Sequence, residues 1–560
     1  MKLKLTRPRN TKCKRALLIP LLAALLLSVA TVAPAVRVVT YNVLNFPGST
    51  GASRESYFRT ALAGVAPDVL VVQEMLSQDG GDQFLDEILN YSTPGEFAAC
   101  PFTNGYDTDN ALFYRVSSVE LVSTQQIGTA LRDISEYVLR PVGYVSTDAE
   151  FRVYSVHLKA GSTSTDQTKR LAEATILRNW TNGLPDGTSF MVVGDFNIRS
   201  STEAAYQKLV GSEADDSGRS FDPIDTPGTW HDNYAFASVH TQSPRTLSFG
   251  GGATGGMDDR FDLILTSASL MDGEVLDWET GTYTAYGNDG LHFNTAINSG
   301  TNYAVGNTVA DALHEASDHL PVYLNLSVPA LVSVPSALDL GTVIVGATHT
   351  EELTLSNTAQ APADELDYEF SVTTGFDAPG AAFELDAGAS AVHDIAMDTS
   401  SAGLKSGVLT VHSDDVDRPT VEVSLSGRVI EHARPSLDDE AVKLADTLDF
   451  GSHAAGEFTT QTFGVSNVAY TSMQALLDVY SAEIVGGDGR FGFVGGFAES
   501  CIGSSTVSYT VEFDDQGATA DSLYEAVLTL NTRDDVGVSG ATDLDDLVLH
   551  LFAFVQSGTS

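Results

Sequence analysis

Two patterns of hydrophobic and polar positions divide the chain near residue 330. Before that point, short continuous apolar runs, typical of buried strands, alternate with stretches of helical periodicity. Seven runs predict strands: Val36–Thr40, Asp68–Val72, Ala111–Tyr114, Arg152–Val156, Ser189–Val193, Phe261–Thr266 and Pro321–Val328. Helical spacing is found in Arg54–Val65 and Gln167–Trp180. The pattern therefore predicts one unit of mixed strands and helices over residues 36–328.

The second predicted helix carries an apolar stripe. Ala172, Ile176 and Trp180 recur every four residues, and Leu177 widens the stripe. Residues at this spacing lie on one face of a helix. We expect this face to pack into the core and not to form a site.

Beyond residue 330 the pattern changes to short alternating strands separated by Gly, Asp and Ser turns, with no convincing helix. The segment Leu338-Asp339-Leu340-Gly341 has a counterpart 110 residues later in Leu448-Asp449-Phe450-Gly451. This repetition predicts two β-sandwich repeats, over residues 331–430 and 441–556, joined by an acidic linker near Glu431–Glu440.

The N-terminus has the layout of a secretory signal peptide over residues 1–35. Its basic residues come first: Lys2, Lys4, Arg7, Arg9, Lys12, Lys14 and Arg15. An apolar stretch, Ala16 to Ala30, and the small residues Ala33-Pro34-Ala35 follow. The stretch is about 15 residues long, short of the about 20 that a membrane span needs. We expect a secreted, extracellular protein with no membrane span after cleavage. Cell-surface association and an uncleaved anchor stay open as alternatives.

Composition and charge narrow the class of protein. The 560 residues are 43% hydrophobic, which is ample for several cores and excludes a wholly disordered chain. The net charge of −44 favours solubility and argues against broad electrostatic adhesion to DNA. After signal cleavage only Cys100 and Cys501 would remain, in different predicted domains, so we expect no disulfide between them and no thiol zinc site.

Six short polar clusters, each beside a predicted strand, carry the candidate chemistry. They are Tyr41-Asn42, Gln73-Glu74, His157, Gly194–Asn197, Asp262 and Ser317-Asp318-His319. The first four follow their strands, whereas the last two stand at or before the start of theirs. If the last two strands run antiparallel to the others, all six clusters meet at one edge of the sheets.

The residue types suit metal-assisted attack on a phosphate ester. Asn42 and Glu74 offer hard oxygen ligands for Mg²⁺. Asp195 can orient or deprotonate a water, and Asn197 can hold a phosphate oxygen or the metal. Each of these residues taken alone is also typical of an ordinary turn at the end of a strand.

The two histidines have separate expected roles. His319 needs a partner to fix its tautomer, and Asp262 is the candidate. Asp318 can bind the metal directly or through water. His157 can donate to a phosphate oxygen or to the leaving group, although a structural role is the alternative.

Two basic residues are weaker candidates for phosphate contacts. They are Arg140, in Leu139-Arg140-Pro141, and Lys159. For both, a solvated surface charge is the alternative.

Six segments together resemble the endonuclease/exonuclease/phosphatase superfamily, which includes pancreatic deoxyribonuclease, apurinic endonucleases, bacterial sphingomyelinases and inositol polyphosphate phosphatases. The segments are Val39–Val43, Val71–Glu74, Ser155–Lys159, Val193–Asn197, Arg260–Ile264 and Ser317–Pro321. The resemblance covers residues 36–328. It implies a four-layer α/β/β/α sandwich and phosphoester cleavage that depends on Mg²⁺ or Mn²⁺, with Ca²⁺ also open.

The resemblance also assigns roles to residues. It places Asn42, Glu74 and Asp318 at the metal and His157 at the phosphate. Asp195 and Asn197 would act on the water and phosphate, and Asp262 and His319 would form the acid–imidazole pair. The two C-terminal repeats resemble all-β immunoglobulin-like sandwich domains, which would contact a cell surface or polymer.

The sequence therefore predicts a secreted, metal-dependent phosphodiesterase, with extracellular nucleic acid as the expected substrate. A phospholipid, as in sphingomyelinases, or a small phosphate ester is the alternative, because no basic insert to grip DNA is evident. A non-catalytic surface adhesin is disfavoured because all six clusters are present. No signal for oligomerisation stands out.

Overall fold

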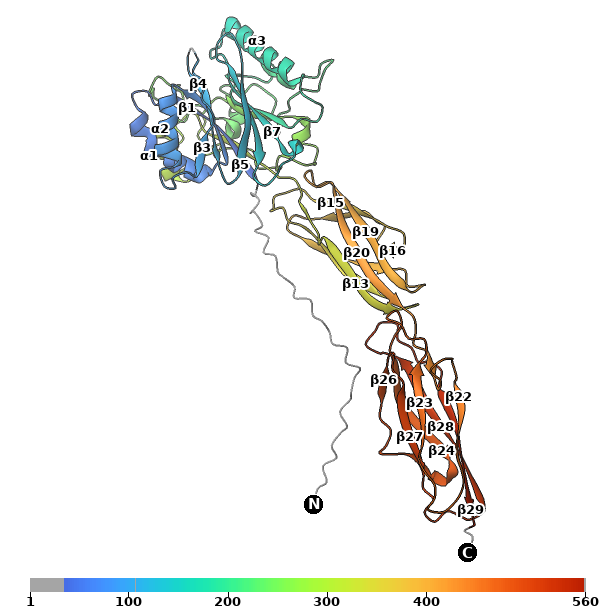
Figure 1. Cartoon of the computed structure of the whole chain (residues 1–560). Helices are drawn as coiled ribbons and strands as arrows, with labels where there is room; N and C mark the ends of the chain where they lie inside the picture. Colours follow the sequence, from blue (N-terminus) through green and yellow to red (C-terminus); the bar gives the residue numbers. More distant parts are fainter. Residues whose placement is uncertain (1–34, 106, 558–560) are drawn as a thin grey trace, which may run out of the picture.

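The computed structural model describes residues 35–105 and 107–557. The predicted signal peptide lies outside these ranges apart from its last residue. Figure 1 shows three bodies in a row: a body of strands and helices, then two bodies of strands. Within the described ranges, no helix is both long and apolar enough to cross a membrane.

Two sheets form the frame of the first body. Six described strands make one sheet, in the order β10 (Thr284–Ala285), β11 (Val322–Leu326), β1 (Val36–Phe46), β2 (Val69–Met75), β4 (Asp109–Arg115) and β3 (Phe97–Ala99). Five make the other, in the order β5 (Val119–Ile127), β6 (Ile134–Pro141), β7 (Phe151–His157), β8 (Phe190–Asp195) and β9 (Asp262–Thr266). All seven predicted strands are confirmed within a few residues, whereas β3, β5, β6 and β10 were not predicted.

The two sheets pack against each other. Along β1, Val38 enters the core between the sheets and Val39 joins the cluster on the outer face, because successive side chains of a strand point to opposite faces. On β8, Met191 and Val193 face the other sheet and Val192 faces outward. Each sheet therefore has one face in the shared core and one face left for helices.

Helices cover both outer faces (Figure 1). The first sheet is covered by α1 (Gly51–Val65), α2 (Gln78–Phe84) and the π-helical turn η1 (Leu85–Leu89), and α5 (Asn307–Ala316) packs beside α1. The second sheet is covered by α3 (Ser164–Thr181) and α4 (Ala204–Val210). Short 3₁₀ turns are η2 (Thr147–Ala149), η3 (Tyr234–Val239) and η4 (Ala268–Leu270). Only α1 and α3 were predicted.

The strand directions bring the polar clusters to one edge. β1 and β2 run parallel, as do β7 and β8, so their carboxyl ends point the same way in each pair. β9 is antiparallel to β8, and β11 is antiparallel to β1. The antiparallel course expected for the last two predicted strands is therefore confirmed.

The expected core face of α3 is wrong in its register. Ala172 is exposed, and Ile176 and Trp180 are only partly buried. The buried face includes Leu177 together with two arginines, Arg170 and Arg178. Polar residues that are buried because they hydrogen-bond to loops are invisible to hydrophobic periodicity, which explains the error.

The two C-terminal bodies have the same topology. The first contains the sheets β12-β14-β18-β16 and β13-β20-β19-β15-β17, and the second contains β21-β23-β27-β25 and β22-β29-β28-β24-β26. The first set is β12 (Val332–Ser333), β13 (Ala337–Ile344), β14 (Thr350–Asn357), β15 (Leu366–Val372), β16 (Phe376–Asp377), β17 (Phe383–Leu385), β18 (Ser390–Met397), β19 (Gly403–Ser413) and β20 (Thr420–Ile430). The second set is β21 (Pro435–Ser436), β22 (Ala445–Ala454), β23 (Gln461–Asn467), β24 (Leu477–Gly486), η5 (Gly487–Gly489), β25 (Phe491–Phe493), β26 (Ser500–Ile502), β27 (Val507–Phe513), β28 (Ser522–Asp534) and β29 (Leu547–Gln556). The strand-by-strand correspondence agrees with the repetition seen in the sequence. β21 lies within the stretch expected to be a linker.

The first body and the first repeat share a bonded junction. Tyr144 donates its hydroxyl to the carbonyl of Pro329 at 2.5 Å, and the backbone amides of Val145 and Ser146 donate to the carboxylate of Asp417. A cavity of about 330 Å³ at this junction is lined mainly by acidic residues: Glu274, Asp277, Asp364, Glu365, Asp367 and Asp414. We call this set the acidic junction.

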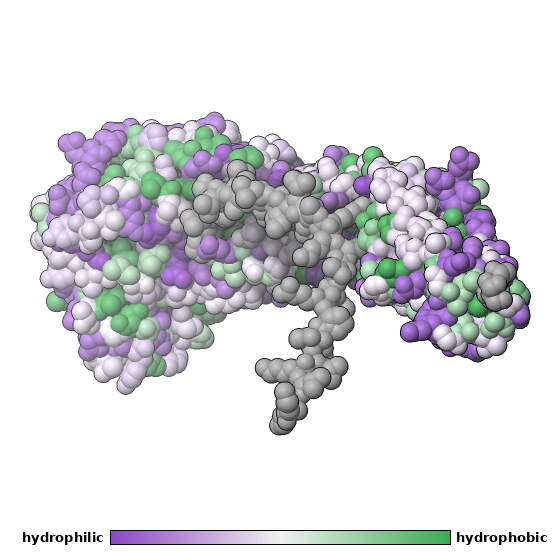
Figure 2. All heavy atoms as spheres, turned by 60° about the horizontal axis from the view of Figure 1, so that its bottom comes forward, coloured by the Kyte–Doolittle hydropathy of each residue, from purple (hydrophilic) through white to green (hydrophobic). Residues whose placement is uncertain are grey.

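Hydrophobic residues on the face seen in Figure 2 lie in small groups among hydrophilic ones. This distribution suits the strongly negative composition. Cys100 is buried and has a free thiol.

Candidate active site

Strand alternation aims four polar side chains into the space between the sheets. Asn42, His157, Asp195 and Asp262 have the same parity as the inward-facing core residues of their strands. His157 pairs with Asp195 across β7 and β8, and Asp195 pairs with Asp262 across β8 and β9. The site is therefore the polar end of the core between the sheets.

Asn42 holds two carboxylates together. Its Nδ2 donates to Glu74 Oε1 at 3.0 Å and to Asp195 Oδ2 at 3.2 Å. Its Oδ1 accepts from the backbone amide of Leu44 at 3.0 Å. The amide nitrogen thus faces the carboxylates, whereas the expected metal role needs the amide oxygen to face them.

Glu74 reaches the site because its backbone is unusual. The β1–β2 and β2–β4 pairings are irregular at this point, and Glu74 has a φ of +65°. That left-handed conformation is costly for a residue with a side chain and recurs at functional sites. Its second oxygen accepts from the backbone amide of Asn45 at 2.9 Å. Asn197, with a φ of +52°, is the second site residue in this conformation.

His319 and Asp262 form the predicted pair. His319 Nδ1 lies 2.8 Å from Asp262 Oδ2, and both side chains are buried. On its other side, His319 Nε2 lies 3.7 Å from Asp195 Oδ2. Asp262 therefore fixes the ring so that Nε2 faces Asp195.

Buried charges shift the pKa values in the site. Burial, helped by the charges of Asp262 and Glu74, raises the pKa of Asp195 to about 7, although the nearby His319 acts to lower it. Burial alone would lower the pKa of His319, but the carboxylates of Asp262, Asp195 and Asp318 outweigh it and raise that pKa well above its ordinary value. Burial keeps the pKa of His157 well below its ordinary value. One imidazole is therefore charged and the other neutral at neutral pH.

His157 and Asp318 complete the ring of polar groups. His157 Nε2 lies 3.6 Å from Asp195 Oδ2 and 3.9 Å from Glu74 Oε1. Asp318 accepts from the backbone amide of Ala253 through Oδ2, while its buried Oδ1 has no hydrogen-bond partner among the described residues. Burial and the charge of Asp318 both raise the pKa of Glu74. An unpartnered buried carboxylate oxygen close to a second carboxylate is a suitable donor set for a hard cation.

A layer of buried polar side chains lies between the two sheets, next to the site. Thr40 donates to Gln73 at 3.3 Å, Gln73 donates to Ser155 at 3.3 Å, and Asn110 donates to the carbonyl of Ser155 at 3.2 Å. All four side chains are buried. The bonds join both sheets, so they set the spacing at which the side chains of the candidate site face each other.

Gly194 permits the close approach of β7 and β8. A Cβ added to Gly194 would lie 2.0 Å from the carbonyl oxygen of Val156, and its φ is +134°. Only glycine fits this position. The glycine of the predicted cluster therefore sets the distance between His157 and Asp195.

The remaining predicted residues, Asn197, Lys159 and Arg140, lie in three different places. Asn197 donates to the carbonyl of Leu158 at 3.2 Å and lies beside the site. Lys159 lies at the rim, where its ammonium faces Asp166 at 3.6 Å.

Arg140 is at the opposite end of the second sheet, and its expected phosphate contact is wrong. β6 is antiparallel to β7, so Ser135, not Arg140, lies near the His157 end. Arg140 bonds instead to Glu120 at 2.9 Å and to the carbonyl of Val145 at 3.0 Å.

Gln242 is a site residue that the sequence did not predict. Its amide nitrogen lies 2.5 Å from His319 Nε2. That arrangement suits a neutral ring nitrogen, and the amide must rotate so that its oxygen can accept when His319 is charged. Gln242 lies in a loop with no strand-like pattern around it, so nothing in the sequence marked it.

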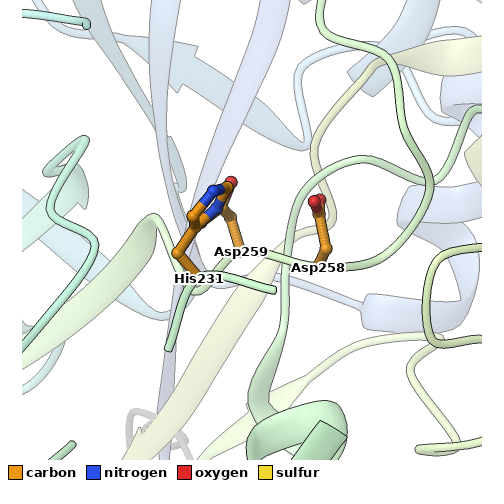
Figure 3. A group of neighbouring side chains, drawn as sticks. All are labelled: His231, Asp258 and Asp259. Atoms are coloured by element: carbon orange, nitrogen blue, oxygen red, sulfur yellow. The ribbon is translucent and has the colours of Figure 1, made fainter. Parts of the chain in front are cut away.

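A second group of metal-ligating side chains lies nearby. The ligand atoms of His231, Asp258 and Asp259 lie within 4.8 Å of one another (Figure 3). His231 Nδ1 is 2.8 Å from Asp259 Oδ1, and the backbone of Asp259 bonds to Gln242. His231 follows no predicted strand, and the consecutive acids Asp258 and Asp259 are the only signal of this group in the sequence.

Comparison with known proteins gives one family and several distant structures. Residues 39–319 match the family described as "Endonuclease/Exonuclease/phosphatase family". No curated protein matches the chain. Similar solved structures include D. rerio TDP2 complexed with single strand DNA product (13% identity, 52% of this chain, 99% of that chain, TM-score 0.35). The human Nocturnin catalytic domain with bound sulfate anion is similar at 16% identity, over 53% of this chain and 96% of that chain, with a TM-score of 0.33. Beta toxin 275-280 from Staphylococcus aureus is similar at 14% identity, over 52% of this chain and 99% of that chain, with a TM-score of 0.31.

Proposed function

The chain belongs to the endonuclease/exonuclease/phosphatase family, and from that premise we propose that it is a divalent-metal-dependent phosphodiesterase whose substrate is nucleic acid. One observation carries this proposal. Asp195 Oδ2 lies 3.6 Å from His157 Nε2 and 3.7 Å from His319 Nε2, inside a buried polar pocket. A carboxylate between a neutral and a charged imidazole suits proton transfer around one reacting group.

The donor set fits a hard divalent cation. Glu74 and Asp318 would hold it, because both are carboxylates and Asp318 Oδ1 is buried without a partner in the described part of the chain. Oxygen ligands of this kind suit Mg²⁺ or Mn²⁺, with Ca²⁺ as a further option. When bound, the cation supplies charge neutralisation at the phosphate.

The residues of the chain divide the proton transfers. Asp195, with a pKa of about 7, accepts a proton from the attacking water, whose oxygen forms the new bond to phosphorus. His319, charged because of Asp262, gives a proton to the leaving oxygen as the old P–O bond breaks. Neutral His157 donates a hydrogen bond to a phosphate oxygen.

A phospholipid head group or a small phosphate ester is the second candidate substrate. The net charge of −44 favours it, because a strongly acidic surface repels a polyanion at long range. The chemistry of the site would be unchanged.

Four further properties belong to the same proposal. The first body would be the four-layer α/β/β/α sandwich of the family. The C-terminal bodies would be immunoglobulin-like domains that contact a cell surface or polymer. The chain would be secreted after removal of residues 1–35. Recovery of the protein from culture medium and N-terminal sequencing test this; absence from the medium would contradict secretion, and an intact N-terminus would contradict the removal of residues 1–35.

A substrate panel tests the proposed function. Plasmid DNA, sphingomyelin vesicles and bis(p-nitrophenyl) phosphate are each incubated with the protein in Mg²⁺, Mn²⁺ or Ca²⁺, with and without EDTA. Cleavage of DNA that EDTA abolishes supports the nuclease. Cleavage of sphingomyelin alone moves the assignment to the second candidate, and no cleavage of any substrate contradicts the hydrolase.

A further inference from the structure

A cavity beside the candidate active site has the chemistry of an anion site. Its volume is about 450 Å³, within the range of ligand pockets. It lies between the start of α3 and the turn that precedes α4. Hydroxyl and amide side chains line it with one arginine: Ser164, Gln167, Thr168, Ser200, Thr202 and Arg199.

Arg199 has no ion-pair or hydrogen-bond partner for its guanidinium among the described residues. The other arginines of the first body all have one: Arg140, for example, pairs with Glu120, and Arg170 with Glu203. In a chain with a net charge of −44, an arginine without a carboxylate partner is notable. Guanidinium groups bind phosphate well because they present several N–H donors in one plane.

Two of the three carboxylates near the cavity, Glu203 and Asp259, are engaged elsewhere. Glu203 lines the cavity, but it makes two bonds to Arg170, at 2.6 and 3.1 Å. Asp259 is bonded to His231. Arg199 acts electrostatically on Asp258 and Asp259 but forms no ion pair with either within the described ranges. A negatively charged ligand therefore meets a guanidinium that has no ion-pair partner in the described ranges, and Asp258 is the one nearby acid left without a partner there.

The cavity lies close to the candidate active site. Arg199 follows Asn197 by two residues, so their Cα atoms are separated by at most about 7 Å. The backbone of Arg199 is fixed, since its carbonyl accepts from the amide of buried Trp230 at 2.9 Å. The cavity is thus preformed and stands at a constant distance from the catalytic groups.

We propose that this cavity, with Arg199 as its anchor, binds a second phosphate of the substrate, adjacent to the phosphate that is cleaved. This inference rests on the proposed function and narrows it to a nucleic acid strand. A head-group ester with a single phosphate would leave the cavity empty of its ligand. A local positive site also explains how an acidic protein can bind a polyanion: the contact between Arg199 and a phosphate holds the strand, although the net charge of the protein repels it.

Charge-matched variants of the full chain test the proposal. Arg199→Gln removes the anchor, and Arg199→Lys keeps its charge. Lys169→Gln removes an exposed positive charge on α3, the helix whose start lines the cavity, but Lys169 itself does not line it. Each is assayed on a single-stranded oligodeoxynucleotide and on bis(p-nitrophenyl) phosphate, which has one phosphate. We expect Arg199→Gln to raise KM for the oligonucleotide about tenfold, the effect of one charged hydrogen bond. KM for bis(p-nitrophenyl) phosphate and kcat for both substrates stay unchanged.

The controls decide against the alternatives. Arg199→Lys should recover part of the lost affinity, and Lys169→Gln should behave as the unaltered protein. An equal rise of KM on both substrates, or an equal effect of Lys169→Gln, would overturn the proposal.

Binding without turnover separates this proposal from the proposed function. Fluorescence anisotropy of a labelled oligonucleotide is measured in EDTA with the same variants. A Kd about tenfold weaker in Arg199→Gln supports the subsite even if no substrate is cleaved, in which case only the hydrolase assignment fails. Cleavage of DNA with a Kd that is the same for Arg199→Gln and the unaltered chain overturns the subsite and leaves the hydrolase in place.

Discussion

At the scale of single residues, the candidate site depends on Asp262 holding His319. The 2.8 Å contact fixes the ring and keeps it charged. In Asp262→Asn the neutral amide preserves the shape but no longer stabilises the imidazolium. We expect kcat to fall by about 10²–10⁴, the usual contribution of a positioned acid or base. Steady-state kinetics on the best substrate of the panel measures this.

Asp259→Asn is the matched control for that variant. It changes the same atoms in a second Asp–His pair of 2.8 Å, formed with His231 outside the ring of catalytic groups. Its kcat should stay within a factor of a few of the original. A similar loss in both variants would show that the effect is one of general stability.

Cation binding should be measurable without any substrate. A cation at 100 times its Kd adds about 2.7 kcal/mol to stability, so Mg²⁺ or Mn²⁺ should raise Tm. Glu74→Gln should lose most of this gain. In EDTA above neutral pH the same variant should melt no lower than the original, because burial and Asp318 make the Glu74 charge unfavourable and raise its pKa. An unchanged response to cation in Glu74→Gln would contradict the assigned ligand.

At the scale of elements, the structure shows why parts of the fold were predictable. Several of the seven predicted strands are continuously apolar, so burial marks them. β6 was missed because it contains Glu136, buried by its bonds to Arg152 at 2.6 Å and to Tyr154 at 3.0 Å. β5 was missed because most of its residues are exposed or partly exposed.

The same reasoning applies to the candidate site. Residues beside strong strands, such as Asp195 and Asp262, were found from their order along the chain. Gln242 was missed, and Arg140 was misplaced, because loop contacts and the direction of an unpredicted strand are not encoded in local pattern. The shape of the pocket depends on pairings between distant residues, which one sequence does not provide.

The corrected face of α3 gives a stability prediction. Leu177 is 1% exposed, so Leu177→Ala should cost about 2–5 kcal/mol of unfolding free energy. Ala172 is exposed, so Ala172→Ser should change stability by no more than about 0.5 kcal/mol. Urea unfolding followed by circular dichroism measures both. Equal losses of unfolding free energy in the two variants would favour the buried face predicted from the sequence.

At the scale of the whole molecule, the acidic junction gives a pH dependence. Burial, together with a smaller effect of neighbouring carboxylates, raises the pKa of Asp277, of Asp364 and of Asp414 to about 6 each. Their unfolded pKa is about 3.9. The folded state therefore binds more protons, so the stability that these groups contribute is fully present below about pH 4 and is lost as pH rises through about 6.

We expect the transition that involves the junction to melt at a higher temperature at pH 5.5 than at pH 7.5. Asp414→Asn should reduce this difference, and Asp394→Asn, an exposed acid in the same repeat, should not. Differential scanning calorimetry resolves the transitions. A higher Tm at pH 7.5 would contradict the sign derived from the raised pKa values.

Because carboxylates crowd the joint between the first body and the first repeat, the stiffness of this joint should depend on the salt concentration. In dilute buffer, near 0.01 M, repulsion extends about 30 Å, whereas at 0.15 M it is confined to about 8 Å. We expect the joint to bend more freely at 0.01 M salt and to be stiffer at 0.15 M, where counterions screen the carboxylates from one another. Small-angle scattering at the two salt concentrations would register this stiffness as a change in the spread of end-to-end lengths.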